Sequence, residues 1–324
     1  MKTGITDLFG IKYPVVCGGM LWLCKPRLCA AISEAGGLGN ITAANYNTGE
    51  ELRAAVREVR KVTDKPFGVN ITLLPSFRIT PETYDDFFKV CCEERVTAIE
   101  VSGAPAKKYI GLVHEAGIKI MHKVGAVRHA LNIERLGYDA VIAAGIEEGG
   151  HPLNDDVTTM VLAPRIVESV KIPVLAAGGI ADGRGLAAAL TLGAEGVLMA
   201  TRFIAVEECK VHPEIKAEII RRQEQDTTLI CKTLHLQGRA LKNDLVSRIL
   251  EVEQCGGGMD ELMPLLTGQR VKDAWGTGDV NEAAFMVGQS IGLIKEVVTC
   301  RELLDRMVKE AEEILVENLA KFQR

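Results

Sequence analysis

The sequence of 324 residues predicts a (β/α)8 TIM barrel with an added C-terminal helical subdomain. Three observations favour this α/β fold class. Between residues 14 and 202, short apolar runs alternate with amphipathic stretches that have helical periodicity. Eight such runs occur, which is the number of strands that closes a parallel barrel. After about residue 206 the alternation stops, and residues 212–270 have the pattern of helices.

Each predicted strand is a short apolar run followed by a loop and an amphipathic helix. The strands are PVVCGG (14–19), GLGNITA (37–43), PFGVNIT (66–72), AIEVSG (98–103), KIMHKVG (119–125), AVIAAG (140–145), PVLAAGG (173–179) and GVLMATR (196–202). Helices that connect consecutive strands make the sheet parallel, because the chain must return to the same end each time. An open, doubly wound sheet is the alternative to a closed barrel.

The helical stretches carry the start and stop signals expected of crossover helices. Residues 48–63 begin with a candidate N-cap, Thr48, followed by acidic residues, and residues 182–193 run from Asp182 to Gly193. Residues 299–323 form an amphipathic closing helix. We therefore assign residues 1–207 and 283–324 to the barrel with its closing helix, and residues 208–282 to the helical subdomain.

Composition points to a globular protein that acts on small molecules. Hydrophobic residues make up 47% of the chain, and the net charge of −5 comes without a basic run, which argues against nucleic acid or a membrane as partner. Nine cysteines contain no C-x-x-C pair, so we expect reduced, mostly buried thiols. The start, MKTGITDLFG, lacks the apolar core of a secretion signal, which predicts a cytoplasmic protein. The composition allows a homodimer.

Unusual residues gather where the predicted strands end. In a barrel of this kind, the carboxyl ends of the strands face the active-site mouth. The residues found there are Gly18, Gly19, Met20, Asn70, Thr72, Ser102, Gly103, Lys123, Gly178, Gly179, Thr201 and Arg202. One end of the barrel therefore collects glycines, which allow close backbone approach, together with a few polar groups.

The loops after the last two strands predict a phosphate site. They are AAGGIADGRG (176–185) and MATRF (199–203). Such loops, with a helix N-terminus pointing into the mouth, present free backbone N–H groups and a positive dipole end to a phosphate. The alternative is tight packing between strand and helix, for which glycine is also suited.

Lys123 and His151 are the candidate reactive side chains. Lys123 lies in a strand otherwise fit for burial, so its ammonium needs an anionic partner unless its head reaches solvent. His122 alternates with Lys123 and is expected in the core on the other face of the strand. His151, in AAGIEEGGHP (143–152), follows two glycines and could act as a base or donor, or merely order its own loop. Glu147 and Glu148 are interpreted as solvated loop residues.

Metal catalysis and nucleophilic hydrolysis are not predicted. No spacing suited to a metal site occurs among His114, His129, His212, His235 and the Asp155-Asp156 pair. The G-x-S-x-G spacing in GQSIG (288–292) does not follow a predicted strand, so it is not a nucleophile elbow. The glycine run in CGGGMDE (255–261) follows a helical pattern instead of a strand, so it is not assigned to a dinucleotide.

Taken together, these motifs resemble the nitronate monooxygenase (2-nitropropane dioxygenase) family of FMN-dependent TIM-barrel oxidoreductases, over almost the whole chain. The segments that carry the resemblance are CGGMLW (17–22), AISEAGGLGNIT (31–42), KPFGVNITLLP (65–75), residues 118–141, AAGIEEGGHP, PVLAAGGIADGRGLAAALTLGA (173–194), ATRF (200–203) and GQSIGLI (288–294). The segment with HK followed by AVRHA is most similar to the bacterial NADH:quinone reductase branch. Flavin-dependent enoyl-acyl-carrier-protein reductases share several of the same patterns.

The resemblance implies a bound FMN and gives a role to each site residue. The family places the phosphate at Gly178, Gly179, Ala200 and Thr201, the isoalloxazine against Gly19 and Met20, its polar edge at Asn70 and Lys123, and an enclosing contact at Gly150 and Gln289. His151 corresponds to the catalytic histidine beside the flavin. Ala200 stands where the family normally has glycine. Phe77 is a candidate gate residue or nicotinamide contact.

The activity that follows is an FMN-dependent oxidoreductase in which NAD(P)H reduces the flavin and the flavin reduces a quinone-like acceptor. One alternative is a nitronate monooxygenase that oxidises alkyl nitronates with O2. A second is a flavin-dependent enoyl-thioester reductase. A third, from a different class, is a sugar-phosphate isomerase or aldolase with Lys123 as a Schiff-base lysine.

Overall fold

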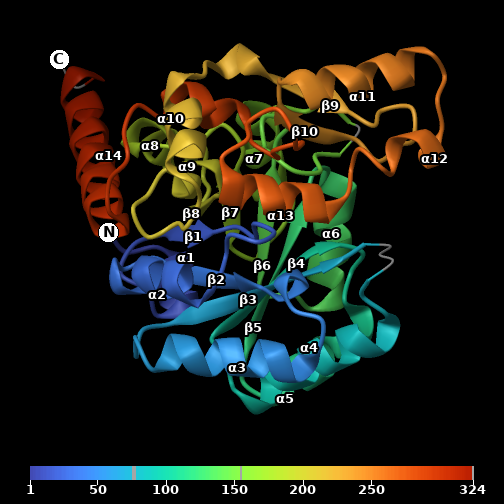
Figure 1. Ribbon diagram of the computed structural model, residues 1–324. Coiled ribbons are helices and arrows are strands. Elements are labelled where there is room, and N and C mark those ends of the chain that lie inside the picture. The colour runs from blue at the N-terminus through green and yellow to red at the C-terminus, as the bar shows by residue number, and fades with distance from the viewer. Residues whose placement is uncertain (75–77, 154, 323–324) are drawn as a thin grey trace.

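The computed structural model describes residues 1–74, 78–153 and 155–322 and confirms the predicted barrel (Figure 1). Eight parallel strands form one sheet in the order β1-β8-β7-β6-β5-β4-β3-β2. They are β1 (Val15–Cys17), β2 (Gly39–Thr42), β3 (Phe67–Leu73), β4 (Ala98–Gly103), β5 (Lys119–Val124), β6 (Ala140–Ala144), β7 (Val174–Ala177) and β8 (Gly196–Met199).

The sheet closes between its first two strands. A parallel bridge joins Val16 of β1 to Leu38, directly before β2. The Cys17 N–H donates to the Leu38 carbonyl over 2.9 Å, and the Leu38 N–H donates to the Val15 carbonyl over 2.9 Å. Since β1 also pairs with β8, the strands form a complete ring and the open doubly wound sheet is excluded.

Helices surround the ring of strands, as the sequence predicts. They are α2 (Pro26–Glu34), α3 (Gly49–Arg60), α4 (Pro81–Glu93), α5 (Ile110–Glu115), α6 (Val127–Leu136), α7 (Thr159–Val167), α8 (Gly183–Thr191) and α14 (Cys300–Phe322). Thr48 caps α3 by accepting a hydrogen bond from the Glu51 N–H. The closing helix α14 packs beside α8 (Figure 1). Across the described residues, none of the helices combines the length and apolar character needed to span a bilayer.

The inside of the barrel is apolar at its amino-terminal end. Inward side chains there include Val16, Leu38, Met121, Ile142, Leu175 and Leu198. The short helix α1 (Gly4–Phe9) adds Ile5 and Phe9 to the same cluster. This plug of side chains leaves the carboxyl end of the barrel as the end that can admit a ligand.

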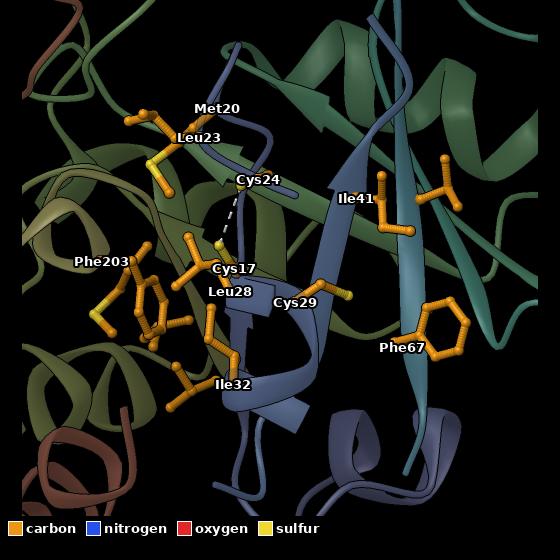
Figure 2. Packing of buried hydrophobic residues seen from close by; sticks show 14 of the residues in the cluster. Cys17, Met20, Leu23, Cys24, Leu28, Cys29, Ile32, Ile41, Phe67 and Phe203 are labelled. Carbon is orange, nitrogen blue, oxygen red and sulfur yellow. Dashed lines mark hydrogen bonds between the residues drawn. The ribbon is translucent and has the colours of Figure 1, made fainter. Parts of the chain in front are cut away.

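A second, larger core lies between the strands and the helices. Figure 2 shows part of it, where Leu28, Cys29 and Ile32 of α2 lie in the same cluster as Cys17, Ile41 and Phe67 of the strands, and α2 packs mainly against β2. All nine cysteines are free and seven are buried, as expected from the sequence. The Cys17 and Cys24 sulfurs lie 3.7 Å apart, and this hydrogen bond and burial raise the pKa of Cys17. These thiols are packing groups, since a thiol with a raised pKa is a poor nucleophile.

The remaining helical elements fall in three parts of the chain. Within the barrel segment they are η1 (Ala43–Asn45), η2 (Lys107–Tyr109) and α9 (Thr201–Ile204). Within 208–282 they are α10 (Pro213–Arg221), η3 (Glu224–Asp226), α11 (Asp244–Gln254), α12 (Met259–Leu262) and α13 (Gly268–Thr277), and η4 (Gln289–Leu293) follows them. The boundaries 1–207, 208–282 and 283–324 remain a prediction.

The expectation of helices throughout residues 212–270 is wrong for the middle of that segment. Two strands, β9 (Thr227–Ile230) and β10 (Gly238–Leu241), form an antiparallel hairpin in which Ile230 pairs with Gly238. The run TTLI is rich in β-branched residues, which favour extended backbone. Its buried residues join a separate small core with Leu245 and Ile249 of α11. This hairpin is important for the site described below.

Candidate functional site

Polar side chains replace apolar ones inside the barrel towards its carboxyl end. Asn70 on β3 and Glu100 on β4 are register partners, and each side chain is buried, with 2% of its surface exposed. Ser102 and Lys123 lie further along β4 and β5 on the same inward face, because successive inward residues are two apart in a strand. The mouth therefore has a polar lining at the end that the sequence predicts.

Lys123 forms an ion pair inside this lining. Its ammonium lies 3.0 Å from both carboxylate oxygens of Glu148, and the two side chains are 19% and 10% exposed. Burial raises the pKa of Glu148, and the Lys123 ammonium opposes this change. Lys123 thus has the anionic partner expected for a buried lysine, whereas the interpretation of Glu148 as a solvated loop residue is wrong.

Glu147 is not a solvated residue either. Its carboxylate accepts hydrogen bonds from the backbone N–H and the hydroxyl of Thr159, at the first turn of α7. The same hydroxyl contacts the carbonyl oxygen of Ala177 at the end of β7, 2.9 Å away. Glu147 and Thr159 therefore connect the loop after β6 to α7 and to the end of β7.

His122 lies on the outer face of β5, as expected from its alternation with Lys123. Its ring packs edge-on against Tyr138, and its Nδ1 atom lies 2.8 Å from the Lys123 carbonyl oxygen. Burial lowers the pKa of His122 to about 4. A neutral core histidine of this kind does not belong to the site.

Glu100 is a member of the site that the sequence reasoning missed. Its carboxylate accepts a hydrogen bond from the Gly19 N–H over 3.0 Å, and the Ser102 hydroxyl lies 3.3 Å from its other oxygen. Burial raises the pKa of Glu100 to about 7, although Lys123 opposes the rise. The available signal was the strand AIEVSG, in which a glutamate takes an inward position between the outward Ile99 and Val101.

The loop after β1 is held against this polar layer. The Met20 N–H donates to the Thr42 hydroxyl over 3.0 Å. Gly19 is required for steric reasons, because a Cβ atom there would lie 2.2 Å from the side-chain amide carbon of Asn70. Met20 lies near Leu23 and Cys24 above the core in Figure 2. The structure thus brings Gly19, Met20 and Asn70 together.

The loops after β7 and β8 supply hydrogen-bond donors. Gly178 and Gly179 have left-handed backbones, with φ of 97° and 75°. Within the described residues, the backbone N–H groups of Gly178, Gly179 and Thr201 have no acceptor. Ala200 separates β8 from α9. These donors suit a phosphate oxygen.

The helix N-terminus expected at this site is already satisfied. The Asp182 carboxylate accepts hydrogen bonds from the Arg184 and Gly185 N–H groups at the start of α8. The Gly183 N–H donates to Glu310 of α14 over 2.8 Å. The first turn of α8 is thus satisfied within the protein, and the loops after β7 and β8 are the remaining source of donors.

The β9-β10 hairpin holds the Gly-Gly-His loop. Gly150 and Arg239 exchange backbone hydrogen bonds of 3.4 and 2.7 Å, and the Arg239 guanidinium donates to the Ile146 carbonyl over 2.9 Å. The Gln237 side-chain amide donates to the carbonyls of Pro152 and Leu153. No local sequence pattern indicates these contacts, because residues 237–239 lie 84 to 93 positions away from their partners in the loop.

His151 lies at the rim of the mouth. Its side chain is exposed, and Nδ1 lies 3.3 Å from the Gln237 carbonyl oxygen. Partial burial of the ring lowers the pKa of His151, and the positive charge of the nearby Lys123 lowers it further. A carbonyl oxygen can only accept, so the neutral ring carries its proton on Nδ1 and leaves Nε2 as an acceptor.

Gln289 also lies at this loop. Its backbone N–H donates to the Glu147 carbonyl over 2.9 Å, and the preceding Gly288 N–H donates to the Thr201 hydroxyl over 2.9 Å. The residues before and in η4 therefore connect the loop after β6 with the loop after β8. Phe77, the candidate gate residue, lies outside the described residues. In the described part of the chain, no group of three His, Cys, Asp or Glu side chains is arranged to hold a metal ion.

Comparison with known proteins gives consistent matches over the whole chain. A family model described as nitronate monooxygenase matches residues 2–310. The chain is 34% identical to (3aS,4S,5R,7aS)-5-hydroxy-7a-methyl-1-oxo-octahydro-1H-indene-4-carboxyl-CoA dehydrogenase from Rhodococcus jostii, covering 96% of each chain. It is 30% identical to a probable nitronate monooxygenase from Staphylococcus saprophyticus, covering 97% of this chain and 99% of that protein.

A solved structure shows the same architecture. FabK from Thermotoga maritima is 41% identical, covers 99% of each chain and superposes with a TM-score of 0.90. The likeness therefore covers nearly the whole length of both chains.

Proposed function

The chain belongs to the nitronate monooxygenase family of oxidoreductases, and from this premise we propose that it binds FMN and transfers electrons from NAD(P)H to a conjugated carbonyl acceptor. The observation that supports this most strongly is the arrangement of one end of the barrel. Backbone donors after β7 and β8, a buried ammonium on β5 and the Gly-Gly-His loop all occur there.

The residues present fit FMN. Gly178, Gly179, Ala200 and Thr201 would hold the phosphate, since donors without an acceptor occur at both loops. Gly19 and Met20 would lie against the ring system, Asn70 and Lys123 at its polar edge, and Gly150 and Gln289 would help enclose it. Ala200 adds one methyl group where the family has glycine, and this side chain is only partly buried. Bound FMN would supply the two-electron chemistry.

The side chains of this protein would bind and polarise the reactants. The Lys123 ammonium, held in position by Glu148, would stabilise negative charge at the polar edge of the cofactor. His151 can donate a hydrogen bond from Nε2 to an acceptor carbonyl only when the ring is protonated, because Nδ1 faces the Gln237 carbonyl. His151 is therefore the group through which acidity would promote reduction of the acceptor.

Two classes of conjugated carbonyl compound are candidate acceptors. A quinone agrees with the likeness of the segment around HK (122–123) to NADH:quinone reductases. An enoyl thioester is favoured by the relative that acts on a carboxyl-CoA compound. A Schiff-base aldolase is disfavoured, because a lysine that attacks a carbonyl must be an unprotonated amine and Lys123 lies in an ion pair.

The experiment is anaerobic reduction of the purified flavoprotein by NADH and by NADPH, followed by addition of a quinone or crotonyl-CoA. We expect the flavin absorbance to bleach with one nicotinamide and to return with one acceptor. Failure of both nicotinamides would refute the reductase proposal. If propionate 3-nitronate in the presence of O2 were consumed without any nicotinamide, the protein would instead be a nitronate monooxygenase.

A further inference from the structure

Glu100 has no assigned part in the reaction proposed above, although it is the most buried carboxylate of the polar layer. It is 2% exposed and lies on β4 between β3 and β5. The groups that face it are the Gly19 N–H from the loop after β1, Asn70 from β3, Ser102 from its own strand and Lys123 from β5. Lys123 in turn faces Glu148, and His151 lies within its field.

The charges of this cluster do not balance. One ammonium, Lys123, pairs directly with Glu148, whose side chain is 10% exposed, and interacts through its charge with Glu100, which is 2% exposed. If both carboxylates were ionised, the cluster would carry one uncompensated negative charge, which is costly away from water. Such a cluster binds one proton readily, and the proton binds to the carboxylate that has the weaker interaction with the Lys123 ammonium.

Geometry decides which of the two carboxylates holds that proton. Glu148 receives the ammonium on both oxygens at 3.0 Å. Glu100 receives only uncharged donors, the Gly19 N–H and the Ser102 and Asn70 side chains. Ionised Glu148 is therefore favoured, and Glu100 is the site of protonation. Burial, which raises the pKa of Glu100 to about 7, agrees with this assignment.

We propose that Glu100 takes up one proton from water when the bound flavin is reduced and releases it when the flavin is re-oxidised. This rests on the proposed function, in which Lys123 lies at the polar edge of FMN. Reduction by hydride transfer delivers two electrons and one proton to the flavin and leaves it with an added negative charge. That charge competes for the Lys123 ammonium, so the Glu100 carboxylate loses part of its support and binds a proton. No electron passes to Glu100.

The coupling acts in both directions. If reduction strengthens proton binding at Glu100, protonation must make reduction more favourable by the same free energy. Protonation of Glu100 also weakens the hydrogen bond that its carboxylate accepts from the Gly19 N–H. Glu100 thus acts as a positioning residue for the loop that carries Gly19 and Met20, and as a store for the proton that balances charge in the closed site.

The test is to measure the flavin midpoint potential of the holoenzyme between about pH 6 and about pH 8. In this range we expect Glu100 to change its protonation state. Glu100→Gln is compared with Glu148→Gln, which removes the same charge from the cluster but keeps Glu100. On reduction by two electrons, we expect the wild type to bind as many as one proton more than Glu100→Gln does. In Glu148→Gln the extra proton should remain, with its pH range shifted towards acid because Lys123 is released to Glu100.

A second measurement needs no variant. The reduced-minus-oxidised infrared spectrum of the wild-type holoenzyme should show the carbonyl band of a newly protonated carboxylic acid. The inference is overturned if the wild type and Glu100→Gln give parallel plots of potential against pH, or if the band is absent. A wild-type protein that binds no flavin would instead refute the proposed function.

Discussion

Replacement of Lys123 by methionine should destabilise the protein in a strongly pH-dependent way. The substitution keeps an unbranched apolar stem of four heavy atoms and removes the ammonium that lies 3.0 Å from both oxygens of Glu148. Glu148 is only 10% exposed, so water compensates poorly for the lost partner. The carboxylate must then remain buried and unpaired, or become protonated.

The free-energy cost of Lys123→Met follows from the distance between the two charges and from the burial of Glu148. Two unit charges at 3.0 Å attract by about 5–6 kcal/mol at an effective dielectric constant of about 20, and the desolvation of both ions offsets part of this. Loss of one partner of such a pair costs about 3 kcal/mol while Glu148 is ionised. Once Glu148 is protonated, only the lost hydrogen bonds remain, about 1 kcal/mol.

The sign of the pH dependence is fixed by Glu148. Its pKa in the folded protein is already raised above the usual 4.5, and removal of Lys123 raises it further. A carboxyl with a raised folded pKa favours the folded state at low pH, and this advantage is lost as the pH rises. Lys123→Met should therefore cost more at about pH 8 than at about pH 5.

The assay is urea unfolding of Lys123→Met and wild type at both pH values. The matched control is Lys119→Met, on the same strand, whose ammonium lies 3.4 Å from Asp139 and whose side chain is 42% exposed. That exposed pair should contribute less than about 1 kcal/mol at either pH. Equal costs for Lys123→Met at the two pH values, or a cost no larger than that of the control, would refute the buried ion pair.

Three further substitutions test separate parts of the account. Gly19→Ala should cost about 1–3 kcal/mol and weaken FMN binding, because its Cβ would meet Asn70 at 2.2 Å. Gly111→Ala, with open space around it, should add about 0.4–1 kcal/mol of stability; equal effects in thermal unfolding would contradict the steric argument. His151→Gln keeps a neutral donor, so its turnover of the acceptor should vary less with pH. Wild-type turnover should rise as the pH falls, in a range below the ordinary titration of histidine, because burial lowers the pKa of His151. A flat wild-type profile would exclude this role.

Glu94→Gln should cost about 1–2 kcal/mol near neutral pH in urea unfolding. Burial opposes ionisation, but hydrogen bonds and charge from Arg57 and Arg53 outweigh it and lower the pKa of Glu94. A lowered folded pKa contributes stability above the unfolded value that is lost as the pH falls. The difference between Glu94→Gln and wild type should therefore disappear in acid, and a constant difference would contradict the assignment.

The fold was accessible from the sequence because its signals are local. Each strand is an apolar run bounded by turns, and Thr48 and Asp182 cap the helices that they precede in the sequence. The β9-β10 hairpin was missed, because TTLI and GRAL are too short to show a period and become strands only by pairing with each other.

The site was only partly accessible for the same reason. Lys123 and His151 are conspicuous in their own segments, but the partner of Lys123 comes from the loop after β6, and that of His151 is Gln237, directly before β10. Glu147 and Glu148 looked like solvated acids because their burial depends on neighbouring elements. Glu100 could have been found, since a carboxylate at an inward strand position requires an explanation.

The central claim is that the carboxyl end of the barrel binds a phosphate-bearing flavin, and its most direct test is binding of the flavin itself. Protein purified from cells should release FMN when denatured, in a ratio of one to each chain, and the stripped protein should bind FMN far more tightly than riboflavin, which lacks the phosphate. A protein that releases no FMN and does not bind it when added, or that binds riboflavin equally well, would contradict the account.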